Sequence, residues 1–156
     1  MFRTKIGHAF LNVRELKRSV DFYSTYLNLR VTEKVGEDVA FLSSGDQHHE
    51  LALLALGLEA AAPVSNGIGL GHLAFEVPDK RSLAEAYRML TGGKVNVSPV
   101  DHQVAWGLYF HDPDGNNIEI CCDTRQEPDG AKAWGGQNRK LAPDRILAAL
   151  ESGITK

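Results

Sequence analysis

The sequence has few cysteines and no long uninterrupted apolar stretch. Its two cysteines, Cys121 and Cys122, are adjacent, and neighbouring residues rarely form a disulfide because on a strand they point to opposite faces. The longest apolar stretch, residues 51–64, is interrupted by Gly57 and Glu59 and is too short to span a bilayer. The first residues lack the apolar core of a signal peptide. We therefore expect a reduced, cytoplasmic protein without a membrane segment.

The sequence also has no strong excess of charge of either sign. The chain has 17 Lys and Arg against 20 Asp and Glu, for a formal net charge of −3. The basic residues form no run, which argues against a nucleic-acid surface. With 156 residues, of which 43% are hydrophobic, the chain is long enough to bury a core.

An internal repeat is present. The segment GHAFLNV at 7–13 resembles GHLAFEV at 71–77 and places His8 and His72 in the same position of the two copies. The correspondence continues to Tyr23 and Tyr87, and the copies then diverge. A repeat of this length indicates two related structural modules.

Both copies have the same pattern of elements. An alternating segment typical of a strand is followed by apolar residues at helical spacing and then by three short strand-like runs. The predicted strands are 6–13, 29–34, 39–43 and 49–54 in the first copy and 71–77, 94–97, 106–111 and 117–122 in the second. Asp79 or Ser82 is expected to cap the second helix. The DPDG sequence at 112–115 predicts a tight turn.

The predicted fold is therefore α+β, with two tandem βαβββ modules at 5–56 and 70–123 in one domain, 1–123. Residues 59–69 form the linker. Two open four-stranded sheets packed edge to edge would give a cupped, half-open barrel, although the sequence leaves their pairing open. The tail, 124–156, is expected to contain a short helix from Pro143 to about Leu150, with Pro in its first turn.

Three residues are candidate metal ligands. Internal symmetry would direct His8 and His72 at one central point, and Glu119 lies in the last strand after the predicted turn. A lone histidine would more often be a hydrogen-bonded core residue. Two imidazoles at matched positions with one carboxylate instead form the facial triad that suits non-haem Fe(II) and leaves positions open for substrate and O2.

Three motifs carry a resemblance to a known family: HHELAL at 48–53, GHLAFEV at 71–77 and DHQVAWGLYFHDPDGNNIEI at 101–120. The chain resembles the vicinal-oxygen-chelate superfamily of glyoxalases, bleomycin-resistance proteins and extradiol dioxygenases, and within it the catalytic half of type I extradiol (catechol 2,3-type) dioxygenases. The resemblance implies Fe(II), with Mn(II) as an alternative, a catechol-type aromatic diol and O2 as substrates, and the ligands His8, His72 and Glu119.

The same resemblance implies three catalytic residues. His49, the second histidine of the HH pair, would act on bound oxygen and on substrate protons. Tyr109, ten residues before Glu119, would hydrogen-bond the substrate oxygen, and a hairpin would bring it alongside the Glu119 strand. His102 is the candidate for a further pocket histidine. Ordinary strand packing for Tyr109 and a solvated strand end for His49 are the structural alternatives. His48 and His111 are expected to face outward or to pack locally.

Other functions stay open on the sequence alone. A glyoxalase-like or epimerase-like lyase or isomerase would need a fourth ligand, for which Glu50 is the candidate, but strand alternation allows only one of His49 and Glu50 to face inward. A metal-free drug-binding protein of the bleomycin-resistance type is the second alternative. A homodimer partner, or Trp134 with the 143–150 helix, is expected to cover the cup, and Cys121 is expected to pack near the site.

Overall fold

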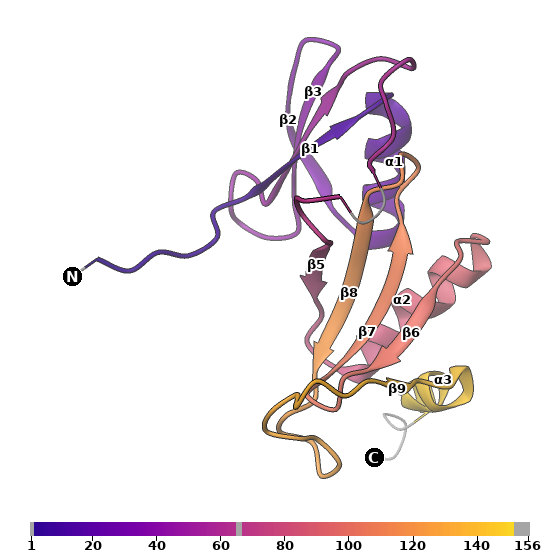
Figure 1. Cartoon of the computed structure of the whole chain (residues 1–156). Coiled ribbons are helices and arrows are strands. Elements are labelled where there is room, and N and C mark those ends of the chain that lie inside the picture. The colour runs from indigo at the N-terminus through magenta and orange to yellow at the C-terminus, as the bar shows by residue number, and fades with distance from the viewer. Residues whose placement is uncertain (1, 65–66, 152–156) are drawn as a thin grey trace. The chain divides into compact units, whose positions relative to one another are not determined.

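The computed structural model describes residues 2–64 and 67–151, which form two compact units (Figure 1). The first unit is built from the described part of Met1–Ile68 together with Asp112–Asn116. The second is built from Gly69–His111 and from the described part of Asn117–Lys156. Among the described helices, none is both long and apolar enough to cross a membrane.

The first unit contains one module. Its elements are β1 (Ala9–Val13), α1 (Leu16–Leu27), β2 (Arg30–Val35), β3 (Val39–Ser43) and β4 (Leu51–Ala55). The sheet order is β1-β4-β3-β2, with β1 parallel to β4 and the other pairs antiparallel. Helix α1 ends where Asn28 adopts a left-handed backbone conformation (φ 54°), which asparagine tolerates better than most residues.

The second unit repeats the module and adds the tail. Its elements are β5 (Leu73–Glu76), α2 (Lys80–Gly92), β6 (Ser98–Asp101), β7 (Ala105–His111), β8 (Asn117–Asp123), β9 (Arg139–Lys140) and α3 (Pro143–Glu151). The order is β5-β8-β7-β6-β9, with β5 parallel to β8. The backbone N–H of Ser82 donates to the Asp79 side chain over 2.7 Å, so Asp79 caps α2. The α+β class and the repeated βαβββ order are confirmed.

Several strand boundaries differ from the prediction. Strands β1, β4 and β5 begin at Ala9, Leu51 and Leu73, so His8, His49 and His72 precede their strands. The predicted strand at 94–97 is wrong, and β6 begins at Ser98 instead. Helix α2 continues to Gly92, and Lys94 then turns the chain with a positive φ of 61°. Residues 94–97 therefore form the connection between α2 and β6 instead of a strand.

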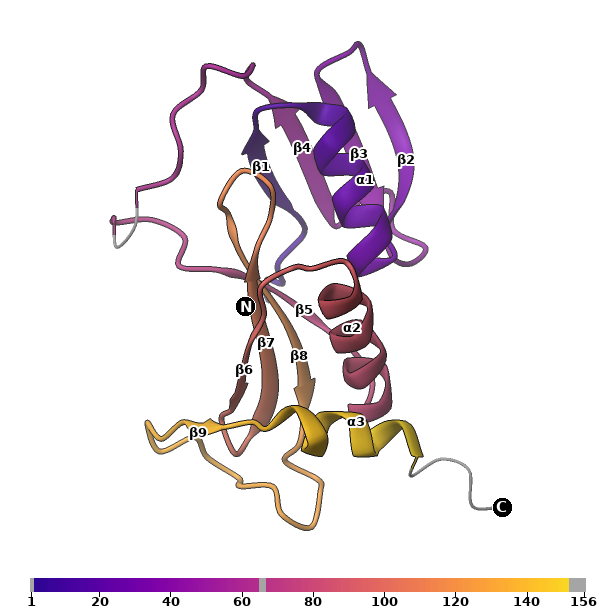
Figure 2. The same ribbon diagram turned by 90° about the vertical axis from the view of Figure 1, so that its right-hand side faces the viewer.

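The tail is an integral part of the second unit. Helix α3 packs against α2 (Figure 2), and Ile146 is fully buried. The Trp106 ring, only 4% exposed, has Lys80 and Arg145 over it at 4.6 and 4.8 Å from the ring centroid. Arg145 also donates to Asp101 over 2.6 Å. The cation–π contact and the ion pair of Arg145 thus hold α3 in place, while Lys80 ties α2 to the same ring.

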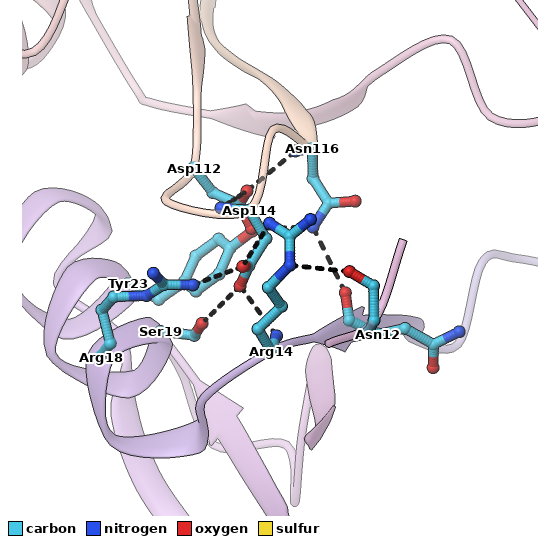
Figure 3. A network of polar contacts seen from close by, with 9 residues as sticks. Asn12, Arg14, Arg18, Ser19, Tyr23, Asp112, Asp114 and Asn116 are labelled. Atoms are coloured by element: carbon cyan, nitrogen blue, oxygen red, sulfur yellow. Dashed lines mark hydrogen bonds and ion pairs between the residues drawn. The ribbon is translucent and has the colours of Figure 1, made fainter. Parts of the chain in front are cut away.

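The predicted DPDG turn is confirmed, and its two aspartates form a buried polar network in the first unit (Figure 3). Asp112 accepts hydrogen bonds from the Tyr23 hydroxyl at 2.9 Å and from backbone N–H groups of its own turn. Asp114 accepts from the backbone N–H of Arg14 at 3.1 Å and from the guanidinium of Arg18. Both carboxylates are almost fully buried, so these donors replace the water that each charge loses.

Candidate active site

The site in the second unit is centred on Glu119. This residue lies on β8, where Ala74 of β5 and Tyr109 of β7 are its direct neighbours in register. Its carboxylate is buried, with 8% of the side chain exposed, and one oxygen lies 3.0 Å from Nε2 of His72. Its other oxygen lies 4.0 Å from Nε2 of His102. The structure therefore brings together Glu119, His72, Tyr109 and His102.

Gly107 provides the space for this carboxylate. It lies on β7, and a β carbon there would come within 2.5 Å of Oε1 of Glu119 and within 3.1 Å of the Tyr109 ring. Any side chain at position 107 would have to displace one of these two groups, because real β carbons do not approach so closely. Sequence reasoning missed this residue, since a glycine inside a strand signals only a close approach of unknown origin.

Tyr109 and His102 form a hydrogen-bonded pair. The Tyr109 hydroxyl lies 2.9 Å from Nε2 of His102. Burial, and then the neighbouring Glu119 carboxylate, raises the pKa of the Tyr109 hydroxyl well above its usual value. The hydroxyl is therefore protonated at neutral pH and available as a hydrogen-bond donor.

Cys121 lies on the Glu119 side of β8, as predicted from strand parity. Burial, and then the negative charge of Glu119, raises the pKa of its thiol to about 11. The thiol is therefore protonated and a poor nucleophile at neutral pH.

A separate histidine cluster lies in the first unit. The rings of His8 and His49 are 4.5 Å apart between centroids, and Phe41 lies 4.8 Å from the His49 ring. Partial burial, followed by the neighbouring His8 and His48, lowers the pKa of His49. His48 is exposed, as expected, and its Nε2 lies 2.9 Å from Glu33. This cluster brings together two of the predicted site residues.

Glu50 has a different role. Its carboxylate accepts hydrogen bonds from the backbone N–H and the hydroxyl of Ser44 at 2.8 and 2.6 Å. These two bonds are the main reason that its pKa is lowered. His49 and Glu50 thus contact different partners, in line with the predicted alternation, and Glu50 closes the turn between β3 and β4.

The donor set suits a divalent metal. In the described part of each unit taken alone, no three His, Cys, Asp or Glu side chains gather around one metal position. The second unit supplies an imidazole and a carboxylate whose nitrogen and oxygen are 3.0 Å apart. Two ligands at metal distances of about 2.1 Å in adjacent octahedral positions are separated by about the same amount. His8 belongs to the first unit, so its membership of the triad stays a prediction.

Comparison with known proteins identifies the family. The sequence model of the Glyoxalase/Bleomycin resistance protein/Dioxygenase superfamily matches residues 5–120. The chain belongs to this superfamily. The fold agrees, because a solved glyoxalase/dioxygenase from Nostoc punctiforme superposes with a TM-score of 0.64 at 28% identity, over 76% of this chain and 90% of that one.

Curated relatives in this superfamily include several enzymes. The chain is 33% identical to a catechol-2,3-dioxygenase of Bacillus subtilis (strain 168) over 77% of its own length, but it spans only 42% of that relative. It is 28% identical to a biphenyl-2,3-diol 1,2-dioxygenase of Rhodococcus globerulus, covering 96% of this chain and 83% of the relative. A lactoylglutathione lyase of Neisseria meningitidis is 27% identical over 74% of this chain and 88% of the relative.

Proposed function

We propose that the protein is an Fe(II)-dependent extradiol dioxygenase that opens the ring of a catechol-type aromatic diol with O2. The observation that carries the proposal is the position of Tyr109 directly opposite Glu119. The Tyr109 hydroxyl also lies within hydrogen-bond distance of Nε2 of His102. The dioxygenase relatives from Bacillus subtilis and Rhodococcus globerulus support it. Mn(II) is the alternative metal.

The ligands in this proposal are His8, His72 and Glu119. The metal, when bound, would bind the diol oxygens and O2 together and transfer electrons between them, because a facial triad leaves positions open. His72 and Glu119 already form a pair, and the buried carboxylate contributes the negative charge that a divalent cation requires. Gly107 keeps the volume in front of this carboxylate free of a side chain.

Three residues are assigned to proton transfer with the substrate: Tyr109, His102 and His49. A diol that binds a cation through its oxygens loses at least one proton, and a hydroxyl beside it stabilises the resulting anion. The protonated Tyr109 hydroxyl is such a donor, and its neighbour His102 can accept a proton. His49 is ordinarily neutral at neutral pH because its pKa is lowered, so we assign it to accept a proton first and to return it later.

The lyase alternative requires a fourth ligand. Glu50, the candidate for that ligand, is engaged by Ser44 through two hydrogen bonds. Releasing it to bind a metal would leave both donors without their partner, which costs free energy. This arrangement favours the three-ligand dioxygenase over the four-ligand lyase.

An anaerobic binding experiment tests the proposal. The iron-loaded protein, titrated with catechol in the absence of O2, is expected to bind it as an anion, which ultraviolet difference spectra report. Tyr109→Phe should weaken this binding by about 1.5–3 kcal/mol, the range for a hydrogen bond to a charged group. Tyr87→Phe, on α2, is the matched control and should bind like the parent. Binding of a neutral catechol, or no binding at all, would contradict the proposal.

A further inference from the structure

The tail segment 131–140 is fastened beside His102. The backbone N–H of Ala131 donates to the carbonyl of Gln103 over 2.8 Å, and the Gln103 side chain donates to the carbonyl of Gln137 over 3.3 Å. Strand β9 at the end of this segment pairs with β6, the strand that leads into His102. Hydrogen bonds therefore anchor the segment before Trp134 and after Asn138, the two residues that contact the His102 ring.

Two tail side chains extend the hydrogen-bond chain that starts at Tyr109. Nε1 of Trp134 donates to Oδ1 of Asn138 over 2.9 Å. Nδ1 of His102 lies 2.7 Å from the same oxygen, and its Nε2 lies 2.9 Å from the Tyr109 hydroxyl. The Trp134 and His102 rings also meet edge to face, with centroids 6.1 Å apart. The chain of contacts thus runs from the tail to the centre of the site.

The chemistry of these groups determines where the His102 proton sits. An indole N–H only donates, so Trp134 requires the oxygen of the Asn138 amide, rather than its nitrogen, to face it. That oxygen only accepts, so Nδ1 of His102 must carry a hydrogen. In a neutral ring Nε2 then has the lone pair, and it faces the Tyr109 hydroxyl.

We propose that Asn138, oriented by Trp134, is a positioning residue that fixes His102 in its Nδ1–H tautomer. His102, with 18% of its side chain exposed, is thereby kept ready to accept the Tyr109 proton at Nε2. The tail beyond Asp123 therefore contributes a positioning residue to the site, in addition to packing against α2.

The consequence for turnover rests on the proposed function. A diol hydroxyl gives its proton to the oxygen of Tyr109 while Tyr109 gives its own proton to Nε2 of His102. The diol oxygen becomes an anion, Tyr109 stays neutral, and His102 becomes a cation whose Nδ1–H still faces Asn138. The other tautomer, with the hydrogen on Nε2, has no lone pair at that position and cannot take part.

The tautomer is measurable in the metal-free protein. Nitrogen-15 NMR distinguishes a protonated ring nitrogen from an unprotonated one, and His102→Gln identifies the signal. Wild type is expected to show His102 as Nδ1–H, and Asn138→Leu should shift most of it to Nε2–H. Asn138→Asp keeps an acceptor and should restore Nδ1–H, while the neighbouring exposed Gln137→Leu should leave the signal unchanged. An Nε2–H ring in wild type, or no change in Asn138→Leu, overturns the proposal.

A kinetic measurement on the iron-loaded enzyme tests the consequence. Asn138→Leu should lower kcat with catechol by about tenfold or more, within the range for impaired acid–base catalysis, and Asn138→Asp should recover most of it. If the tautomer shifts but kcat does not, the positioning role is overturned. If no variant, including wild type, consumes O2 while the tautomer behaves as expected, the proposed function fails and the tautomer assignment stands.

Discussion

Gly107 and Glu119 lie so close across the β7–β8 pair that one added β carbon on Gly107 would be 2.5 Å from the Glu119 carboxylate. The carboxylate is buried and also contacts His72. Its position therefore depends on the absence of a side chain on the neighbouring strand.

We accordingly expect Gly107→Ala to displace the Glu119 carboxylate. Overpacking of this kind costs about 1–3 kcal/mol of unfolding free energy, and the bound iron should fall well below one equivalent. Gly92→Ala is the control, because a β carbon there meets open space and should leave iron content intact. The measurements are denaturant unfolding and metal analysis. Full iron binding by Gly107→Ala would show that the carboxylate does not hold the metal.

The buried Asp114 network should dominate the local stability of the first unit. Asp114→Ala leaves the partly exposed Arg18 guanidinium and the Arg14 backbone N–H without their acceptor. Leaving such donors unsatisfied costs about 1–3 kcal/mol. Asp21→Ala removes only an exposed pair with Lys17 and should leave the unfolding free energy nearly unchanged. Urea unfolding compares the two. Equal losses would contradict the role assigned to the network.

The Asp79 cap predicts a pH-dependent difference in stability. Hydrogen bonds from Ser82 lower the pKa of Asp79 below 3.8. A lowered pKa in the folded state stabilises the protein above pH 3.8 and stops doing so as the pH falls through the folded-state value. Asp79→Ala should therefore lower the unfolding free energy by about 1 kcal/mol at pH 7, and the difference should shrink near pH 3. A difference that grows on acidification would contradict the cap assignment.

His49 and Glu50 should respond in opposite ways to substitution. His49→Phe should leave iron bound but slow turnover by about 100-fold or more, as loss of an acid–base group does. Glu50→Gln should leave turnover nearly unchanged, because its carboxylate bonds to Ser44 rather than to the site. Steady-state kinetics at saturating catechol measure both. If Glu50 rather than His49 proves necessary for metal binding, the protein belongs with the four-ligand lyases.

Much of the fold could be predicted because the sequence repeats itself. The matched segments around His8 and His72 and the alternating strands fixed the βαβββ order, and the turn signal at 112–115 predicted the β7–β8 hairpin. The resemblance pointed to Tyr109, and a hairpin was expected to bring it alongside the Glu119 strand. The register confirms this and places Tyr109 directly opposite Glu119. Short periodic patterns carry this information locally.

Contacts that depend on long-range packing could not be predicted. Strand β9 has only two residues, Arg139 and Lys140, too few for a pattern, and it forms only because the tail returns to β6. Trp134 contacts the His102 ring and is linked to it through Asn138, which no motif marked. Whether Trp134 covers the site stays a prediction. The requirement for glycine at position 107 comes from the Glu119 side chain on the neighbouring strand, and no local sequence pattern indicates it. Whether the chain works alone or as a homodimer also stays a prediction.

The most direct test of the central claim is oxygen uptake by protein loaded with Fe(II) under anaerobic conditions, with mono- and bicyclic catechols as substrates. The account predicts about one iron per chain, about one O2 consumed per catechol and a yellow ring-opened semialdehyde, as expected for a facial triad with open positions. Glu119→Gln should remain folded but lose tight iron binding and turnover. An iron-loaded protein that consumes no O2 with any catechol, yet isomerises a glutathione hemithioacetal, would contradict the dioxygenase assignment and establish the lyase instead.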